Sequence, residues 1–197
     1  MPARQFVIGL TGSLGMGKSQ TAKLFAAEGI PVFDADAAVH DLYAKEAAVM
    51  IEAAFPGTTR QGVVDRAALA ARLTADAGAL SRLEGLIHPL VAARKQEFLA
   101  RNQAAPLVVL DIPLLLETGE KVDALVVATA PASVQKARGM ARPGMSEAKF
   151  QALLARQISD AEKRAQADYL VMTDKGLDDA REQVRMILAD IRAKLDA

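Results

Sequence analysis

A glycine-rich segment near the amino terminus carries the residue types and spacing that point most directly to chemistry. Residues 12–19 read Gly-Ser-Leu-Gly-Met-Gly-Lys-Ser, a glycine followed by four residues and then by Gly-Lys-Ser. Glycines let backbone N–H groups turn inward around phosphate oxygens, a lysine here reaches the β- and γ-phosphates, and a serine hydroxyl ligates Mg²⁺. We therefore predict a site for ATP and Mg²⁺. The residues expected to contact the nucleotide are Gly12, Gly15, Met16, Gly17, Lys18, Ser19 and Gln20.

Two acidic residues follow the second apolar run of the chain. Asp34 and Asp36 are one residue apart, so their side chains share a face if the strand geometry persists. The carboxyl ends of strands are where α/β sheets bind ligands, and either acid could receive the proton of an acceptor hydroxyl or hold a magnesium-bound water. The alternative is that one of them caps a helix starting near Ala37.

A third acid, Asp111, closes the apolar run over residues 107–110. It has the position of the acid that orients Mg²⁺ in phosphate-loop enzymes, the alternative being an ordinary turn aspartate. We predict Ser19 and Asp111 as the metal site. The sequence has no guanine-reading Asn-Lys-x-Asp, and Asp111 continues into Ile112-Pro113-Leu114 rather than Asp-x-x-Gly. These features disfavour a GTPase and favour a small-molecule kinase.

The elements that must position these residues alternate along the chain. Short apolar runs predict strands over residues 5–10, 30–33, 107–110, 124–128 and 169–172. Helical spacing predicts helices over residues 18–28, from 37 to 43, over 132–166 with a break at 142–144, and over 177–195. Residues 47–102 have apolar residues at helical spacing and one weak strand signal at 63–64. We expect a three-layer α/β fold of the P-loop NTPase type with a parallel five-stranded sheet and a helical insertion.

The composition limits the classes of partner. With 197 residues, 51% of them hydrophobic, the chain can bury one substantial core and a small inserted lobe. Its 24 basic and 24 acidic residues give a net charge of +0, so no overall field would attract a nucleic acid. There are no cysteines, and the apolar stretch at residues 6–10 is too short for a membrane span. We expect a cytoplasmic protein with no membrane partner, and no obligate protein partner is evident.

Several sequence blocks, taken in order, resemble the dephospho-coenzyme A kinase family. The blocks are Gly-Leu-Thr-Gly-Ser-Leu-Gly-Met-Gly-Lys-Ser at 9–19, Asp-Ala-Asp at 34–36, Leu-Ile-His-Pro-Leu-Val at 86–91, Asp-Ile-Pro-Leu-Leu-Leu-Glu at 111–117 and Arg-Pro-Gly-Met-Ser at 142–146. The stretch at 157–169, with Glu-Lys-Arg at 162–164 and Ala-Asp-Tyr at 167–169, also looks like the family. Gln20 departs from its pattern, as does Met-Thr-Asp-Lys at 172–175.

The resemblance implies transfer of the ATP γ-phosphoryl group to the ribose 3'-hydroxyl of dephospho-coenzyme A, the last step of coenzyme A synthesis. It implies a core of about residues 1–36, 104–135 and 168–197, an acceptor-binding helical insertion of about 37–103, and a lid of about 136–167, called here the lid segment. Asp36 is the first choice and Asp34 the second for the acid near the acceptor hydroxyl. The residues implied to face the acceptor are Asp36, His88, Pro113 and Glu117. Lys18 and Arg142, the latter from the lid segment, would supply positive charge at the phosphates.

Other interpretations of these residues stay open from the sequence alone. His88 before Pro89 could mark a helix break. Positive charges of the lid segment could be a solvated helical face; they are Arg138, Arg142, Lys163 and Arg164. The enzyme alternatives are a shikimate-like or nucleotide-like kinase, although the Gly-Gly-Gly acceptor motif of shikimate kinases is missing. A different class is an ATP-binding switch with slow turnover.

Overall fold

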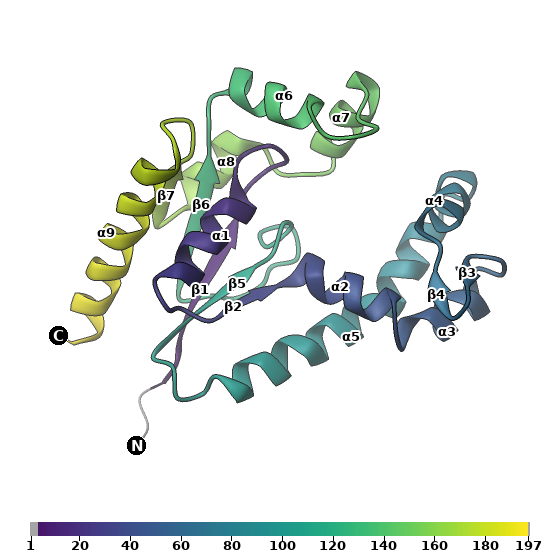
Figure 1. The fold of residues 1–197 in the computed structure, drawn as a ribbon, viewed down its shortest axis with the longest axis horizontal. Helices are drawn as coiled ribbons and strands as arrows, with labels where there is room; N and C mark the ends of the chain where they lie inside the picture. The colour runs from purple at the N-terminus through teal and green to yellow at the C-terminus, as the bar shows by residue number, and fades with distance from the viewer. Residues whose placement is uncertain (1–3, 197) are drawn as a thin grey trace. The chain divides into compact units, whose positions relative to one another are not determined.

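The apolar runs form the central sheet of the computed structural model, which describes residues 4–196 (Figure 1). The strands are β1 (Phe6–Thr11), β2 (Val32–Asp34), β5 (Leu107–Asp111), β6 (Ala124–Thr129) and β7 (Tyr169–Met172). They lie in the order β2-β5-β1-β6-β7, and β1 pairs in parallel with both β5 and β6. β5 and β6 are buried at every position, as expected for strands covered on both faces. The predicted five-stranded parallel sheet is confirmed.

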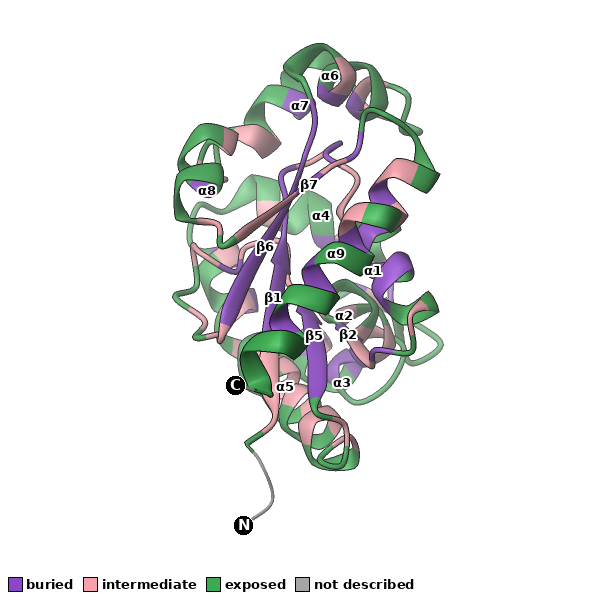
Figure 2. Ribbon diagram, turned by 90° about the vertical axis from the view of Figure 1, so that its left-hand side faces the viewer, coloured by how far each residue is buried: buried purple, intermediate pink, exposed green. Residues whose placement is uncertain are grey.

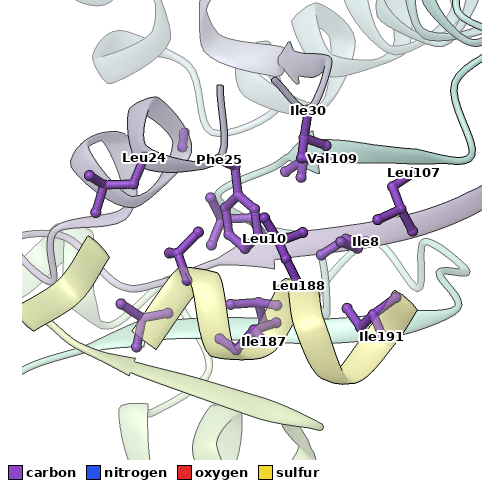
Figure 3. Close-up of a cluster of buried hydrophobic side chains, with 14 of the residues drawn as sticks. Ile8, Leu10, Leu24, Phe25, Ile30, Leu107, Val109, Ile187, Leu188 and Ile191 are labelled. Carbon is purple, nitrogen blue, oxygen red and sulfur yellow. The ribbon is translucent and has the colours of Figure 1, made fainter. Parts of the chain in front are cut away.

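One face of this sheet is covered by α1 (Lys18–Ala27) and α9 (Leu177–Leu195). Ile8 and Leu10 of β1 share this face because side chains alternate along a strand. Figure 3 shows Phe25 of α1 and Leu188 of α9 meeting them in a buried cluster. Each such side chain contributes about 1.5–3 kcal/mol when it leaves water. This burial fixes the start of α1, and with it Lys18, against the sheet.

The other face of the sheet has a smaller apolar cluster. Leu125 and Val127 point there from β6 and pack with Leu115 from the turn after β5. The helix α8 (Asp160–Gln166) also packs against β6. Figure 2 shows the buried strands β1, β5 and β6 with exposed residues on the surrounding helices. Sheet and helices thus form the three layers expected from the sequence.

The lid segment is helical and is interrupted twice. α6 (Ala132–Met140) ends before Arg142, and α7 (Glu147–Leu154) begins after Ser146, whose hydroxyl accepts a hydrogen bond from the Lys149 N–H. The predicted break at residues 142–144 is therefore confirmed. A second break precedes α8, which begins with a capping box between Ser159 and Glu162. That second break was not predicted.

Residues 34–101 form a compact unit with its own core. It contains α2 (Ala35–Tyr43), α3 (Ala47–Ala54), the hairpin strands β3 (Thr59–Arg60) and β4 (Val63–Val64), α4 (Arg66–Ala75) and α5 (Ala79–Arg101). Leu42, Ile51, Phe55, Leu69 and Leu83 are among its buried core residues. Apart from Asp34 at the end of β2, the sheet belongs with the lid segment to the other compact unit.

The structure of this unit differs from the sequence expectations at Asp36, at Pro89 and at residues 59–60. The strand geometry does not continue to Asp36, because α2 begins at Ala35. The chain does not break its helix before Pro89, because α5 continues through this residue. The weak strand at residues 63–64 is confirmed, but its partner at 59–60 was not predicted. Its hairpin turn is made by Gln61 and Gly62, both with positive φ.

Within residues 4–196, every helix is too short or too polar to cross a lipid bilayer.

Candidate functional site

The glycine loop lies between the end of β1 at Thr11 and the start of α1 at Lys18, as the motif requires. Two of its glycines adopt a left-handed backbone, with φ of 82° at Gly15 and 88° at Gly17. A Cβ at Gly15 would lie 2.5 Å from the Gln135 carbonyl oxygen, and one at Gly17 would lie 2.8 Å from the Thr173 hydroxyl. Only glycine fits both the conformation and the space.

The loop is held by hydrogen bonds to the residues that directly follow β6 and β7. The buried Met16 accepts the Ala130 N–H at its sulfur at 3.2 Å, and its carbonyl accepts the Thr173 hydroxyl at 2.9 Å. The Met16 N–H donates to the Ser13 carbonyl at 3.0 Å. The Met16 side chain is therefore buried in the protein interior, and its N–H and carbonyl are both used in hydrogen bonds within the protein. Gly12, where β1 has just ended, is buried.

Lys18 and Asp111 are brought together in a largely buried ion pair. The Lys18 Nζ donates to Oδ1 of Asp111 at 2.6 Å. The side chains are 11% and 2% exposed, and Asp111 is the last residue of β5. Asp111 stands at a strand end, as both sequence interpretations expect, but its carboxylate is buried and paired with Lys18. The pair puts a carboxylate and an ammonium at the loop.

A cavity of about 440 Å³ opens beside the loop. Gln20 lines it from the exposed side of α1, next to the exposed Ser19. Its other lining residues come from the loop and α1, from α6, from the residue after β7 and from the start of α9, and they are Gly17, Thr21, Leu24, Arg138, Thr173, Gly176, Leu177 and Ala180. The cavity combines apolar walls with a guanidinium and hydroxyls, a composition typical of small-molecule sites.

Arg138 and Thr173 are functional candidates that were not among the predicted site residues, although Thr173 lies in the stretch at 172–175 that departs from the family pattern. Arg138 donates to the Thr173 hydroxyl at 2.8 Å and to its carbonyl at 2.7 Å. Because the same hydroxyl donates to the Met16 carbonyl, Arg138 is connected to the glycine loop through one residue. Arg138 is exposed, as the solvated-face interpretation expects, but it also makes these two hydrogen bonds to Thr173. The position of Arg138 in a helical pattern could not indicate this contact, because Thr173 lies far away in the sequence, just after β7.

Two residues implied to face the acceptor have partners within the protein. The Pro113 carbonyl accepts the Thr11 hydroxyl at 2.9 Å. Glu117 Oε1 accepts the Ile158 N–H at 2.8 Å and lies 3.1 Å from the Nζ of Lys163. Lys163 is 0% exposed, so it is not part of a solvated face. Glu117 thus connects the turn after β5 to α8.

Arg142 lies at the turn between α6 and α7 and is exposed. This agrees with either a residue of a moving lid or a solvated charge. The structure leaves both sequence interpretations of Arg142 standing.

The remaining predicted residues belong to the compact unit of residues 34–101. Asp34 is the N-cap of α2, and its Oδ1 accepts the Ala37 N–H at 2.9 Å. Asp36 lies in the first turn of α2 with no such capping role, and it is exposed. His88 is exposed on α5, which packs against α2. The capping alternative therefore describes Asp34, and the structure shows no capping bond for Asp36.

A sheet with this strand order, a glycine loop before α1 and a buried lysine–aspartate pair define the P-loop class of nucleotide-binding proteins. A family model described as dephospho-CoA kinase matches residues 6–179. A dephospho-CoA kinase from Mesorhizobium japonicum is 56% identical over 192 residues, which cover 95% of this chain and 98% of the relative. The chain belongs to the dephospho-CoA kinase family.

Solved structures agree with this fold. The crystal structure of TT1252 from Thermus thermophilus is 33% identical, with a TM-score of 0.82, and the match covers 95% of this chain and 98% of that one. A dephospho-CoA kinase from Campylobacter jejuni has a TM-score of 0.68 at 22% identity, over 95% of this chain and 97% of that one. At 22% identity, the similarity to this second structure shows a shared fold only.

Proposed function

We propose that this chain transfers the γ-phosphoryl group of ATP to the ribose 3'-hydroxyl of dephospho-coenzyme A, giving coenzyme A. The observation that carries the proposal is the match to the dephospho-CoA kinase family over residues 6–179, which includes the complete glycine loop. The absence of cysteine is compatible with a cytoplasmic location for this reaction.

Binding and charge stabilisation are assigned to residues around the loop. The loop N–H groups and the dipole of α1 favour phosphate oxygens at the start of the helix. Lys18 would exchange part of its interaction with Asp111 for the phosphates, and Arg142 would add a second positive charge. In phosphoryl transfer, such positioned charges supply most of the catalysis. The cavity lined by Arg138 and Thr173 is the proposed place for the nucleoside of ATP.

Ser19 and Asp111 are the proposed residues for Mg²⁺. A hydroxyl and a carboxylate are the oxygen donors that this ion prefers, and Mg²⁺ keeps several waters and phosphate ligands of its own. A large protein cage is therefore not needed, and among residues 4–196 no cluster of three or more acids, histidines or cysteines suits a metal. The ion would neutralise charge on the phosphates during transfer.

Asp36 is the proposed acid that accepts the proton of the 3'-hydroxyl. It remains uncommitted in the first turn of α2, whereas Asp34 is used as the cap. The insertion that carries Asp36 and His88 has a core of its own, so it can present a stable surface to a long acceptor. Binding of the remote parts of the acceptor can then orient its reacting hydroxyl.

An acceptor series tests this proposal. Phosphoryl transfer from ATP is measured with dephospho-coenzyme A, AMP and adenosine, using the wild-type chain and Lys18→Ala. We expect kcat/KM for AMP and adenosine to be at least about 10²-fold below that for dephospho-coenzyme A, with part of the loss in kcat. Equal efficiency with AMP would reject the coenzyme A assignment. Near-normal turnover by folded Lys18→Ala would reject the phosphate-loop assignment.

A further inference from the structure

The peptide groups of one loop residue are held from two sides by glutamine side chains. The Leu14 N–H donates to Oε1 of Gln157 at 3.1 Å, and the Leu14 carbonyl accepts from Nε2 of Gln135 at 3.0 Å. Leu14 stands in the turn of the glycine loop, immediately before Gly15. Both of its peptide groups are thus bound by residues far away in the sequence.

These two glutamines stand at opposite ends of the α6–α7 pair. Gln135 is on α6, one residue before the lid segment as defined above, and Gln157 follows α7. The chain between them, residues 136–156, includes Arg142. One loop residue is therefore bonded to both ends of the part of the lid segment that carries the proposed phosphate-binding arginine.

Both glutamines are themselves firmly placed. Gln135 is only 9% exposed, and its backbone carbonyl oxygen would lie 2.5 Å from a Cβ on Gly15. Next to Gln157, the Ile158 N–H donates to Glu117. Three residues on, the Asp160 carboxylate accepts the Thr129 hydroxyl at 2.8–2.9 Å. Contacts of this kind fix the base of α6–α7 to the sheet and leave little freedom to the two side chains.

We propose that Gln135 and Gln157 are positioning residues of the phosphate site, which together fix the orientation of the Leu14 peptides and hence of the loop N–H groups that follow. This rests on the proposed function, in which those N–H groups bind the phosphates of ATP. Each peptide unit is planar, so fixing the Leu14 N–H sets the plane of the Ser13–Leu14 peptide, and fixing the Leu14 C=O sets the plane of the Leu14–Gly15 peptide, which carries the Gly15 N–H. Preorganised N–H groups bind developing charge without reorganisation.

The two hydrogen bonds have opposite polarity, and this permits a crossed test. Gln157 must accept, which a glutamate also does, whereas Gln135 must donate, which an ionised glutamate cannot do. Methionine has similar length and flexibility and offers neither strong interaction, so it removes the bond at either position. The variants are Gln157→Met, Gln157→Glu, Gln135→Met and Gln135→Glu. Gln151→Met is the matched control, because this exposed glutamine of α7 bonds only to Glu147 one turn earlier.

The first measurement is amide hydrogen exchange of Leu14 by NMR in the full chain without nucleotide. We expect exchange to become about tenfold faster in Gln157→Met, corresponding to the loss of one hydrogen bond, and to stay within about twofold of wild type in Gln157→Glu and Gln151→Met. Unchanged exchange in Gln157→Met, or equally fast exchange in Gln157→Glu, would overturn the assignment of Gln157. Circular dichroism and thermal unfolding confirm that each variant is folded.

The second measurement separates positioning from a general structural role. We expect Gln135→Met and Gln135→Glu to weaken ADP and ATP binding by about tenfold, while the KM for dephospho-coenzyme A stays within about twofold. Wild-type nucleotide affinity in Gln135→Glu, or an equal loss for both substrates, would overturn the assignment of Gln135. If the wild-type chain binds ADP but does not phosphorylate dephospho-coenzyme A, the proposed function fails, and the exchange and ADP-binding results still decide the positioning role.

Discussion

Replacing Asp111 with asparagine removes the charge beside Lys18 and keeps the shape of the side chain. The two charged atoms are 2.6 Å apart, and the side chains are 2% and 11% exposed. At an effective dielectric constant of about 20, unit charges at this distance attract by about 6 kcal/mol. Much of that attraction offsets the desolvation of the two ions, so the intact pair contributes little net stability. Removing one partner leaves the other charge buried and uncompensated.

We expect Asp111→Asn to lower the free energy of unfolding of the nucleotide-free protein by about 3 kcal/mol. The value lies at the low end for broken buried pairs because Lys18 keeps some access to water. Urea denaturation measures it. Asp178→Asn is the control, since Asp178 pairs with Arg181 at the same 2.6 Å but is 94% exposed. Salt and solvent screen such a surface pair, and we expect no measurable change.

ATP should partly restore the stability of the Asp111→Asn variant. With EDTA present to remove Mg²⁺, the phosphates give Lys18 a new partner without competition from the carboxylate. We therefore expect saturating ATP to raise the Tm of Asp111→Asn more than that of the wild type. With Mg²⁺ and acceptor present, kcat should fall by at least about 10²-fold if Asp111 orients the ion.

Two results would refute this reasoning. If Asp111→Asn unfolds at the same urea concentration as Asp178→Asn, with an unchanged slope, the buried pair does not have the energetics derived above. If ATP with EDTA stabilises Asp111→Asn no more than the wild type, Lys18 does not bind the phosphates.

Asp36→Asn should lower kcat by at least about 10²-fold with a smaller effect on ATP affinity, whereas Asp34→Asn should stay close to wild type because asparagine also caps α2; the reverse result in steady-state kinetics would exchange their roles. Arg142→Ala should lower kcat more than it raises the KM for ATP, because an arginine that arrives with a closing lid acts mainly in the transition state, and unchanged kinetics would make it a solvated charge. The pKa of Glu52 lies below its usual 4.5, chiefly because the Gly57 N–H donates to its carboxylate. The stability that the ionised Glu52 carboxylate contributes is thus complete at pH 7, and it is lost as the pH falls below 4.5 and passes the lowered pKa of the folded state. Glu52→Gln should therefore reduce the loss of unfolding free energy at acidic pH, measured by urea denaturation.

Local sequence patterns were sufficient to predict the strands and the helix that hold the glycine loop. β5 and β6 are continuous apolar runs, and the start of α1 is given by the Gly-Lys-Ser of the motif. Strand lengths differ from expectation by a residue or two, because ends depend on hydrogen bonds to neighbouring strands that no local pattern contains. β3 was missed because Thr59 and Arg60 lack the paired β-branched apolar residues that marked β4 at Val63 and Val64, and its pairing follows from the backbone of Gln61 and Gly62.

Contacts between segments that are distant in the sequence could not be predicted from the sequence alone. The alternation of Asp34 and Asp36 suggested one strand face, but the N-cap of α2 uses Asp34 and turns the chain into a helix before Asp36. Pro89 suggested a break, yet the packing of α5 keeps it within a helix despite the missing N–H. The Leu14 contacts with Gln135 and Gln157 join positions 121 and 143 residues apart, so no local signal for them exists.

The register of β1 also gives the chain an order of assembly during synthesis. Phe6 pairs with Leu107 and Ile8 pairs with Ala124, so the first strand made has to wait for partners made much later. Residues 34–101, which emerge in between, are contiguous and have a core of their own. We expect this unit to fold first on the ribosome and the sheet to close late, since non-local pairing is slow. Until β5 and then β6 emerge, the unpaired edges of β1 are available to chaperones and to aggregation.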